Sequence, residues 1–194
     1  MGDFSILCDR LPDSVTVNGR VCPILTDFRR WILMLDLFDE CRESSDAPLD
    51  LITAAKCAIR IVSAEPDGLS DLPADSLAAL LEALAVFASG GAEPASTDEH
   101  GDSVQVIDFS CDAELILSAF QSAYGIDLTR EYVHWWRFLA LLRALPADTD
   151  LMRVVSLRTC DTTKIGDDEL RRRMRRAKAA VRIRQRTDGS PKRN

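Results

Sequence analysis

The chain has 194 residues, 46% of them hydrophobic and 28% charged, a composition that supports a packed core and is not typical of a disordered protein. Its most apolar stretch, 133–145, is interrupted by one histidine and two arginines, which excludes the roughly 18 consecutive apolar residues of a membrane-spanning helix. The formal net charge of −7 is unevenly distributed, because residues 1–152 carry 10 Lys and Arg against 26 Asp and Glu, whereas residues 153–194 carry 14 against 5.

A β-hairpin followed by a helix is predicted near the N-terminus. The segment 14–22 reads SVTVNGRVC, in which two β-prone runs flank an Asn-Gly pair that readily adopts the positive φ angles of a type I′ turn. Thr26 or Asp27 can cap the helix that follows. This helix should end near 41–45. Its apolar residues recur at helical spacing: Phe28, Trp31, Ile32, Leu35 and Phe38.

Two more helices and a linker complete the first half of the chain. An apolar stripe behind an Asp-Ala-Pro start signal predicts a helix from about 49 to 62. A third helix begins at Asp75 or Ser76 and should stop at a Gly-Gly pair. That pair opens the segment 90–103, GGAEPASTDEHGDS, which is predicted to be a linker because it is rich in Gly, Ser, Pro and acid. Residues 1–89 then form the N-terminal part.

Residues 104–160 are predicted to form a helical core that opens with an amphipathic helix. Asp108, Ser110 or Asp112 can cap this helix, and Gly125 is placed to terminate it. The apolar residues recur at i, i+3, i+4, i+7 and i+11: Ala113, Ile116, Leu117, Phe120 and Tyr124.

The most enclosed helix is predicted from 130 to 145. Almost all of its residues are apolar or aromatic, apart from one narrow polar stripe of Arg130, His134 and Arg137. His134 is therefore expected on the helix surface with its polar atoms satisfied, and not as a ligand or a base. Pro146 should end this helix, and an Asp-Thr-Asp turn should start a shorter one that runs through Leu157.

Residues 161–194 are predicted to form a basic helix and tail. The acidic start 166–169 suits the positive end of a helix dipole, and the helix should run to about Arg186. It carries a seam of two apolar residues per heptad, Leu170, Met174, Ala177 and Val181, among the arginines Arg171, Arg172, Arg173, Arg175 and Arg176. A helix with so narrow a seam is not stable alone in water. We therefore expect the seam to pack on its own body or on a neighbouring subunit, and the arginines to meet acidic residues of the first 152.

The sequence offers no catalytic motif. It has no GxSxG, no GxxxxGK[ST] and no GxGxxG, and its two histidines, His100 and His134, leave little scope for acid–base chemistry. The acidic clusters 148–150 and 167–169 could hold magnesium, but their position just before apolar periodic runs favours helix capping. We therefore predict neither an enzyme nor a cofactor.

The six cysteines are predicted to be reduced and to serve as small core residues. They are far apart, they form no CxxC pair and neither histidine is near one, so a zinc site has little support: Cys8, Cys22, Cys41, Cys57, Cys111 and Cys160. The N-terminus carries no basic segment followed by an apolar one. A cytoplasmic location is therefore expected.

Trp135 and Trp136 belong to the most unusual pentapeptide, YVHWW. Adjacent residues on a helix point about 100° apart, so one ring can fill the core while the other meets a second helix or the surface. A packed core anchor is favoured, since large aromatic residues are mostly buried. The alternative is an aromatic hot spot on a partner interface. With the last helix, the candidate partner-binding residues are Trp135, Trp136, Leu170, Arg171, Arg172, Met174, Arg175, Ala177 and Val181.

Residues 104–185 resemble a family of tailed-bacteriophage proteins named by position as gene product fifteen, whose members are commonly encoded just ahead of the tape-measure gene. The matching segments are VIDFSCDAELILSAFQSAYGIDL at 106–128, VHWWRFLALLRAL at 133–145 and DTDLMRVVSLRT at 148–159. Tyr-Gly-Ile-Asp followed by His-Trp-Trp is the most specific part, and the basic last helix resembles the family's Lys/Arg-rich end.

The resemblance implies a tail-assembly chaperone that keeps the long, helical tape-measure protein soluble and helps to recruit tail-tube subunits. Such a protein would be a non-catalytic homo-oligomer in the host cytoplasm and absent from the mature virion. The alternative is a nucleic-acid-binding phage protein that uses the Arg-rich helix. Docking on protein is favoured, because the arginine run has no interleaved aromatic residue and the −16 balance of residues 1–152 repels a duplex.

Overall fold

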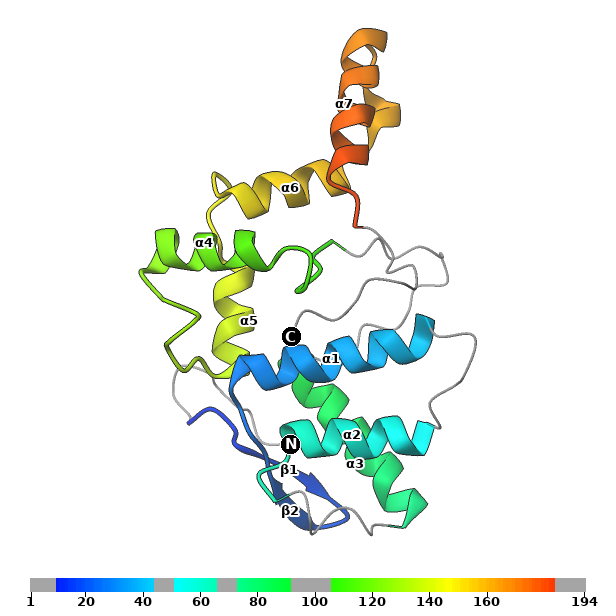
Figure 1. The fold of residues 1–194 in the computed structure, drawn as a ribbon, viewed down its shortest axis with the longest axis vertical. Helices are drawn as coiled ribbons and strands as arrows, with labels where there is room; N and C mark the ends of the chain where they lie inside the picture. The colour runs from blue at the N-terminus through cyan, green and yellow to red at the C-terminus, as the bar shows by residue number, and fades with distance from the viewer. Residues whose placement is uncertain (1–9, 44–50, 66–72, 92–105, 184–194) are drawn as a thin grey trace, which may run out of the picture. The chain divides into compact units, whose positions relative to one another are not determined.

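The computed structural model describes residues 10–43, 51–65, 73–91 and 106–183. Within these ranges the fold is mainly α-helical with one short antiparallel hairpin, which confirms the predicted fold class (Figure 1). The elements in chain order are β1 (Ser14–Val17), β2 (Arg20–Pro23), α1 (Phe28–Glu43), α2 (Leu51–Val62), α3 (Ala74–Ala88), α4 (Ala113–Tyr124), α5 (Trp135–Arg143), α6 (Asp150–Thr159), the 3₁₀ helix η2 (Thr162–Lys164) and α7 (Asp168–Ala180).

The contacts divide the chain into two compact units. The first contains residues 1–98 and 130–143, and so holds the hairpin, α1, α2, α3 and α5. The second contains residues 99–129 and 144–194, and so holds α4, α6, η2 and α7. The division differs from the predicted segments, because α5 groups with the N-terminal helices. The predicted linker lies outside the described residues apart from its two glycines.

The hairpin follows from its turn. Asn18 and Gly19 have φ angles of 50° and 78°, as a type I′ turn requires at both central positions. The strands are in the register that this two-residue turn sets, with Val17 opposite Arg20 and Ser14 opposite Pro23. The predicted hairpin is therefore confirmed, and α3 packs against it within the first unit.

Aromatic rings from three helices form the core of the first unit. The ring centroids of Trp31 in α1 and Phe87 in α3 lie 4.5 Å apart, and those of Phe28 in α1 and Phe138 in α5 lie 4.6 Å apart. Trp135 stacks on Phe138 at 5.7 Å. Large apolar side chains contribute most to a core, so these rings hold α1, α3 and α5 together. Helix α2 runs alongside α1 (Figure 1).

The start of α5 differs from the prediction. The helix begins at Trp135 and not at residue 130. The backbone just before it is paired with the segment that leads into α1: the Phe28 amide donates to the Val133 carbonyl at 3.0 Å, and the Trp135 amide donates to the Thr26 carbonyl at 2.7 Å. Periodicity within the segment could not indicate this pairing, because the partner residues are more than 100 positions away in the sequence.

Most of the helix ends have the predicted chemistry. Gly125 ends α4 in the left-handed conformation, at a φ of 69°. The Thr149 hydroxyl accepts from the Met152 amide at the start of α6, and the Asp167 carboxylate accepts from the first amides of α7. Three ends differ from the prediction. Helix α3 begins at Ala74, ahead of both predicted capping residues, and Asp112, the residue before α4, makes no side-chain capping bond. Helix α7 ends at Ala180 and not near Arg186. None of the helices within the described ranges is long and apolar enough to cross a membrane.

Candidate functional site

A buried ion pair joins two segments of the second unit. Arg158 in α6 and Asp112, just before α4, are 7% and 2% exposed. Their side chains meet in the bidentate geometry that favours arginine over lysine, with Nη1 to Oδ2 at 2.6 Å and Nη2 to Oδ1 at 2.9 Å. The hydrogen bond to the carboxylate raises the pKa of Arg158 above its usual value, so the guanidinium stays charged.

The same guanidinium joins three parts of the second unit. Its Nε donates to the Val181 carbonyl after α7 at 2.7 Å, and its Nη1 also donates to the Val106 carbonyl at 2.9 Å. The Asp112 carboxylate in turn accepts from the Asp108 amide at 2.9 Å. A buried charge is tolerated when its donors are satisfied in this way. We call Arg158, Asp112 and these bonds the arginine clamp.

Sequence reasoning missed the arginine clamp. Its two charged residues are 46 positions apart, and the local pattern indicates Asp112 only as a helix cap. One local signal was present: Arg158 stands seven residues after the buried Leu151, on the same side of α6. An arginine on the apolar side of a short helix indicates a buried partner, although it does not identify it.

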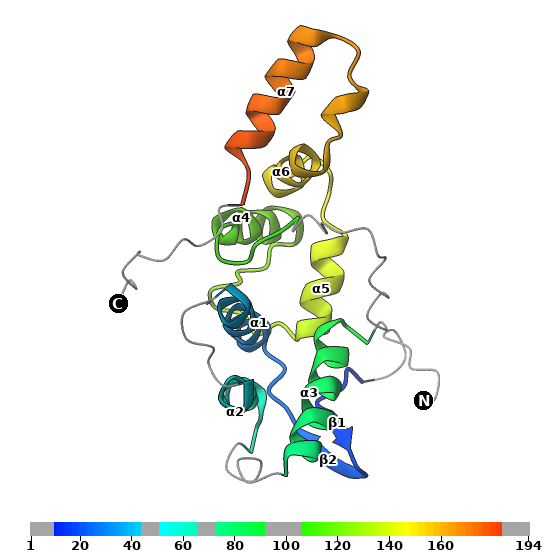
Figure 2. The same ribbon diagram turned by 90° about the vertical axis from the view of Figure 1, so that its right-hand side faces the viewer.

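The inner side of α7 faces α6 and η2, and Figure 2 shows α7 folding back beside α6. Polar bonds to carbonyls make up much of this contact: Lys178 donates to the Cys160 carbonyl at 2.9 Å, and Arg171 donates to the Ile165 carbonyl at 2.6 Å. Three members of the predicted seam are half-buried: Met174 and Ala177 in α7, and Val181 directly after it. The first member of the seam, Leu170, remains 48% exposed.

The outer side of α7 is strongly basic. Four of the predicted arginines are exposed there: Arg172, Arg173, Arg175 and Arg176. The fifth, Arg171, is half-buried, and the ion pair described for it joins Asp168 on the same helix at 2.6 Å. The expectation that these arginines meet acidic residues of the first 152 stays a prediction.

The two adjacent tryptophans both lie against the end of α3. Trp135 is 1% exposed, and its Nε1 donates to the Ala88 carbonyl at 2.9 Å. Trp136 is half-buried, and its Nε1 donates to the Phe87 carbonyl at 2.9 Å. Trp135 therefore has the place of a core anchor, with both its ring and its N–H group satisfied inside the first unit.

His134 is buried, so the expectation of a surface histidine is wrong. It is 8% exposed, its Nδ1 accepts from the Trp136 amide at 3.1 Å and its Nε2 lies 2.9 Å from the Pro12 carbonyl. These partners require the neutral tautomer that carries its proton on Nε2. Burial lowers the pKa of His134, while the bond to Pro12 and the charge of Asp13 offset part of the shift. The residue is buried because the preceding backbone is paired and not helical.

The described cysteines differ in their environments. Cys22 is buried, Cys57 and Cys160 are half-buried, and Cys111 is exposed, so the expected core role is wrong for Cys111. All four are free thiols, and the side chains of the other two lie outside the described part of the chain. Among the residues that the structure describes, no three His, Cys, Asp or Glu side chains are grouped so that they could hold a metal ion.

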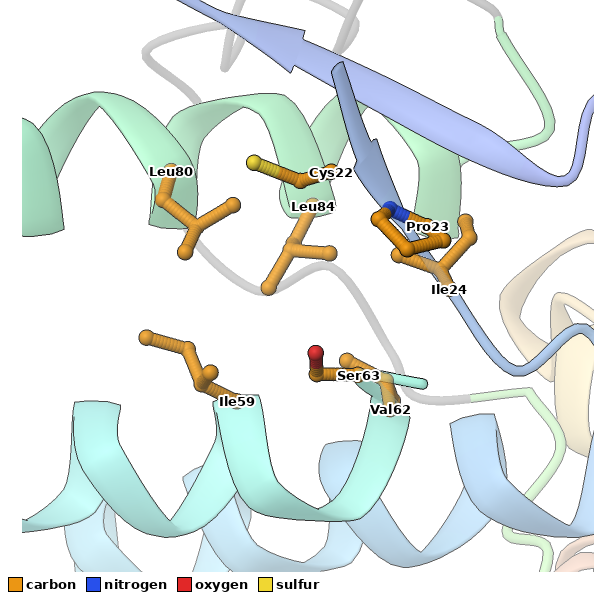
Figure 3. A pocket seen from close by; sticks show the side chains of 8 residues that line it. All are labelled: Cys22, Pro23, Ile24, Ile59, Val62, Ser63, Leu80 and Leu84. Atoms are coloured by element: carbon orange, nitrogen blue, oxygen red, sulfur yellow. The ribbon is translucent and has the colours of Figure 1, made fainter. Parts of the chain in front are cut away.

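A cavity in the first unit is too small for an organic ligand. It lies between the hairpin, α2 and α3, where Cys22 and Leu84 face Ser63 and its neighbours (Figure 3). Its volume is about 10 Å³, which is near the smallest space that holds one water molecule. The Ser63 hydroxyl already accepts from the Glu65 amide at 3.1 Å. We assign no binding role to this cavity.

The fold and these surfaces define a small, mainly α-helical protein with a basic outer helix held by a buried arginine. A family model described as bacteriophage Gp15 protein matches residues 7–183 of the 194, and the chain belongs to this family of bacteriophage proteins. The match extends the resemblance noted for residues 104–185 to nearly the whole chain. Searches of curated proteins and of solved structures gave no match.

Proposed function

We propose that this bacteriophage protein is a tail-assembly chaperone that binds the tape-measure protein and assists assembly of the tail tube, without catalysing a reaction. The observation that carries the proposal is the family match over residues 7–183. It is supported by the resemblance to proteins commonly encoded just ahead of the tape-measure gene. A tape-measure protein is a long helical chain whose apolar stripes need cover until the tube surrounds it, and a helix-in-groove contact provides such cover.

The contact between α6 and α7 is the surface we assign to this client. The apolar seam of α7 is narrow and Leu170 at its start is 48% exposed, so a client helix could pack beside it or take the place of α7. Bonds from Lys178 and Arg171 to backbone carbonyls hold α7 where it is. Each such hydrogen bond contributes little net stability, because water competes for the same groups. A client helix could therefore displace α7 from this position.

Co-expression with the tape-measure protein of the same phage tests the proposal. The full chain should co-purify with the client and raise its soluble fraction, whereas a chain truncated after Gly166 should do so less. Self-association should also weaken in the truncated chain, and salt should reduce the effect because the arginine contacts are screened. If the full chain neither co-purifies with the client nor raises its soluble fraction, the proposed function is wrong.

A pair of point variants locates the client surface. Leu170→Asp places a charge at the exposed end of the seam and should reduce client solubility, while Leu33→Asp in α1 serves as the matched control because Leu33 is also exposed, at 52%. Equal loss in both variants would indicate that the binding surface is not at α7.

A nucleic-acid-binding role is the second candidate, and the exposed arginines of α7 are the observation that favours it. Binding to phosphates releases counterions from the nucleic acid, so the logarithm of Kd should rise linearly with the logarithm of the salt concentration. The −16 charge balance of residues 1–152 opposes it. Gel-shift measurements at low salt with duplex and single-stranded DNA and RNA test this role. If none of these nucleic acids is shifted, the nucleic-acid-binding role is wrong.

A further inference from the structure

Helix α7 is held to the end of α6 by hydrogen bonds near its own C-terminal end. The Nε of Arg158 in α6 donates to the Val181 carbonyl directly after α7 at 2.7 Å, and the Nζ of Lys178 donates to the Cys160 carbonyl directly after α6 at 2.9 Å. No residue of α7 is buried. A helix held by a few such bonds and by no buried side chain detaches at a lower cost than the core of its unit unfolds.

Both sides of this contact need a partner. An isolated helix of 13 residues with a narrow apolar seam is not stable in water. On α6, the Nη atoms of Arg158 already bind Asp112 and the Val106 carbonyl, so without Val181 the buried Nε would be a donor without an acceptor. The Val181 carbonyl lies at a helix end, where carbonyls have no partner within the helix. A detached α7 is therefore expected to return to an α6 that offers these groups.

The seam of α7 is incompletely covered in a single copy. Met174, Ala177 and Val181 are half-buried, and Leu170 is 48% exposed although it belongs to the same seam. A seam of two apolar residues per heptad is typical of a helix that packs along its length against other helices. A second copy therefore meets apolar surface on α7 that the single chain leaves open.

The segment that connects α6 to α7 is long enough to reach another copy. Residues 160–167 run out along α7 before the helix returns toward α6 (Figure 2). Because Lys178 lies beside Cys160, the segment has to span the distance along α7 from residue 178 back to residue 168, which is about 15 Å. Its eight residues reach about 26–29 Å when extended. An opened segment can therefore place α7 on a neighbouring molecule.

We propose that two copies of this protein exchange their α7 helices, so that the α7 of each copy packs on the α6 of the other. The Val181 carbonyl of each copy then accepts from the partner's Arg158, and Lys178 donates to the partner's Cys160 carbonyl. Because the contacts of the single chain form again, the exchange changes mainly the path of residues 160–167, and the protein concentration decides between single chain and pair. The inference goes beyond the proposed function, since it concerns self-association and needs no tape-measure protein.

Shortening the connecting segment tests the exchange. Deletion of residues 162–166 leaves three residues between the helices, which reach only about 10–11 Å. This is less than the roughly 15 Å from residue 168 to residue 178, so α7 can no longer dock on its own α6. The deletion variant should sediment as a dimer at concentrations where the wild-type chain is monomeric, and its far-UV circular dichroism should retain the helical content.

Two results of this experiment overturn the proposal. The first is a deletion variant that remains monomeric. The second is a wild-type chain that shows no dimer at any concentration up to about 1 mM.

A variant that changes the same segment without shortening it is the matched control. T162G/T163S/K164G/I165S keeps the number of residues, so α7 still reaches its own α6. This variant should remain monomeric at the concentrations where the wild-type chain is monomeric. If it forms a dimer there as the deletion variant does, the length of the segment is not the cause and the proposal is wrong.

Two substitutions in the deletion variant test which side of α7 holds the pair together. Lys178→Met removes the bond to the Cys160 carbonyl and should raise the dissociation constant of the dimer about two- to tenfold. Arg175→Met removes one charge from the exposed outer side of the same helix and should leave the constant unchanged. Equal effects of the two substitutions contradict docking by the inner side of α7 and overturn the proposal.

Mixing labelled and unlabelled wild-type chains shows the exchange directly. The two forms are incubated together at a concentration where the dimer prevails. Isotope-filtered NMR should then show contacts between the Val181 methyl groups of labelled copies and the α6 of unlabelled copies. A dimer in which these contacts occur only within each chain is not exchanged, and this result overturns the proposal.

Discussion

Replacing Arg158 by Met leaves the Asp112 carboxylate buried without its guanidinium. Removing one partner of a buried pair costs about 3–5 kcal/mol, far more than the pair contributes when intact, because the remaining charge has lost its hydration and its donors. We expect Arg158→Met to lower the free energy of unfolding of the second unit by about this amount. Urea denaturation followed by far-UV circular dichroism measures it.

Two variants serve as controls for the arginine clamp. Arg153→Met removes an exposed pair with Asp150 on the same helix, so its effect should be about 0–1 kcal/mol. The double variant D112L/R158M removes both charges and should recover much of the loss. A loss from Arg158→Met no larger than that from Arg153→Met would show that the ion pair is not buried in solution.

The buried His134 makes the stability of the first unit depend on pH. Its folded-state pKa is lowered by burial, so the unfolded chain binds more protons between the folded value and the unfolded value of about 6.5. The stability that neutral His134 contributes is present above the unfolded value and is lost as pH falls through the folded value. Protonation also places a proton on Nδ1, where the Trp136 amide now donates.

Unfolding free energies at about pH 7.5 and about pH 5.5 test this dependence. The chain with His134 should lose more stability between the two values than His134→Gln does, both in a His100→Gln background that leaves no other histidine. An equal loss in the two chains would contradict the assignment. An NMR titration of the single imidazole gives the folded pKa independently.

Residues with a local signal were predictable, and residues whose role depends on distant partners were not. Asn18 indicates its turn because asparagine readily adopts a positive φ angle. Asp167 indicates its capping role because a helical sequence follows it. The burial of His134 and Arg158 depends on a carbonyl 122 positions away and a carboxylate 46 positions away. A periodicity argument treats such polar residues as exposed, because it considers only one element at a time.

At the scale of elements, the end of α3 is fixed by a close approach. Gly91 has a φ of 79°, and a Cβ atom there would lie 2.8 Å from the Cη2 atom of Trp136. Gly91→Ala should therefore destabilise the first unit by more than the roughly 1–2 kcal/mol that a left-handed alanine costs. Chemical denaturation with tryptophan-independent detection measures the difference.

Gly19→Ala is the matched control for this substitution. Gly19 has nearly the same φ, 78°, but nothing lies within 4 Å of its added Cβ. Gly19→Ala should therefore lose only the stability that a left-handed alanine costs, about 1–2 kcal/mol. If both alanine variants lose the same stability, the indole of Trp136 is not packed against the glycine.

The elements themselves were predictable to different degrees. The helices with strong apolar periodicity and capping residues, such as α4 and α6, have ends close to those predicted. The helix α5 begins later than predicted, because Val133 and His134 are extended and paired with the segment before α1. Pairing across a long sequence separation overrides local helix preference.

At the scale of the whole molecule, the first unit is assembled from two separate stretches of chain. Residues 130–143 supply α5, whose Trp135 and Phe138 are 1% and 0% exposed in the core. A chain that ends at Thr129 should therefore lack a cooperative unfolding transition for α1, whereas one that ends at Leu145 should regain it. Amide hydrogen exchange of α1 in the two chains is the measurement, and equal protection would contradict the division into units.

The placement of the indole groups has an optical consequence. All three tryptophans of the chain, Trp31, Trp135 and Trp136, lie in the first unit, and each donates its Nε1 hydrogen to a backbone carbonyl there. Intrinsic fluorescence excited at the indole band therefore reports on the first unit, while the second unit, which holds α7 and the arginine clamp, contributes no indole emission. Emission recorded on an unlabelled sample thus follows the first unit alone, whereas far-UV ellipticity of the same sample follows the helices of both units.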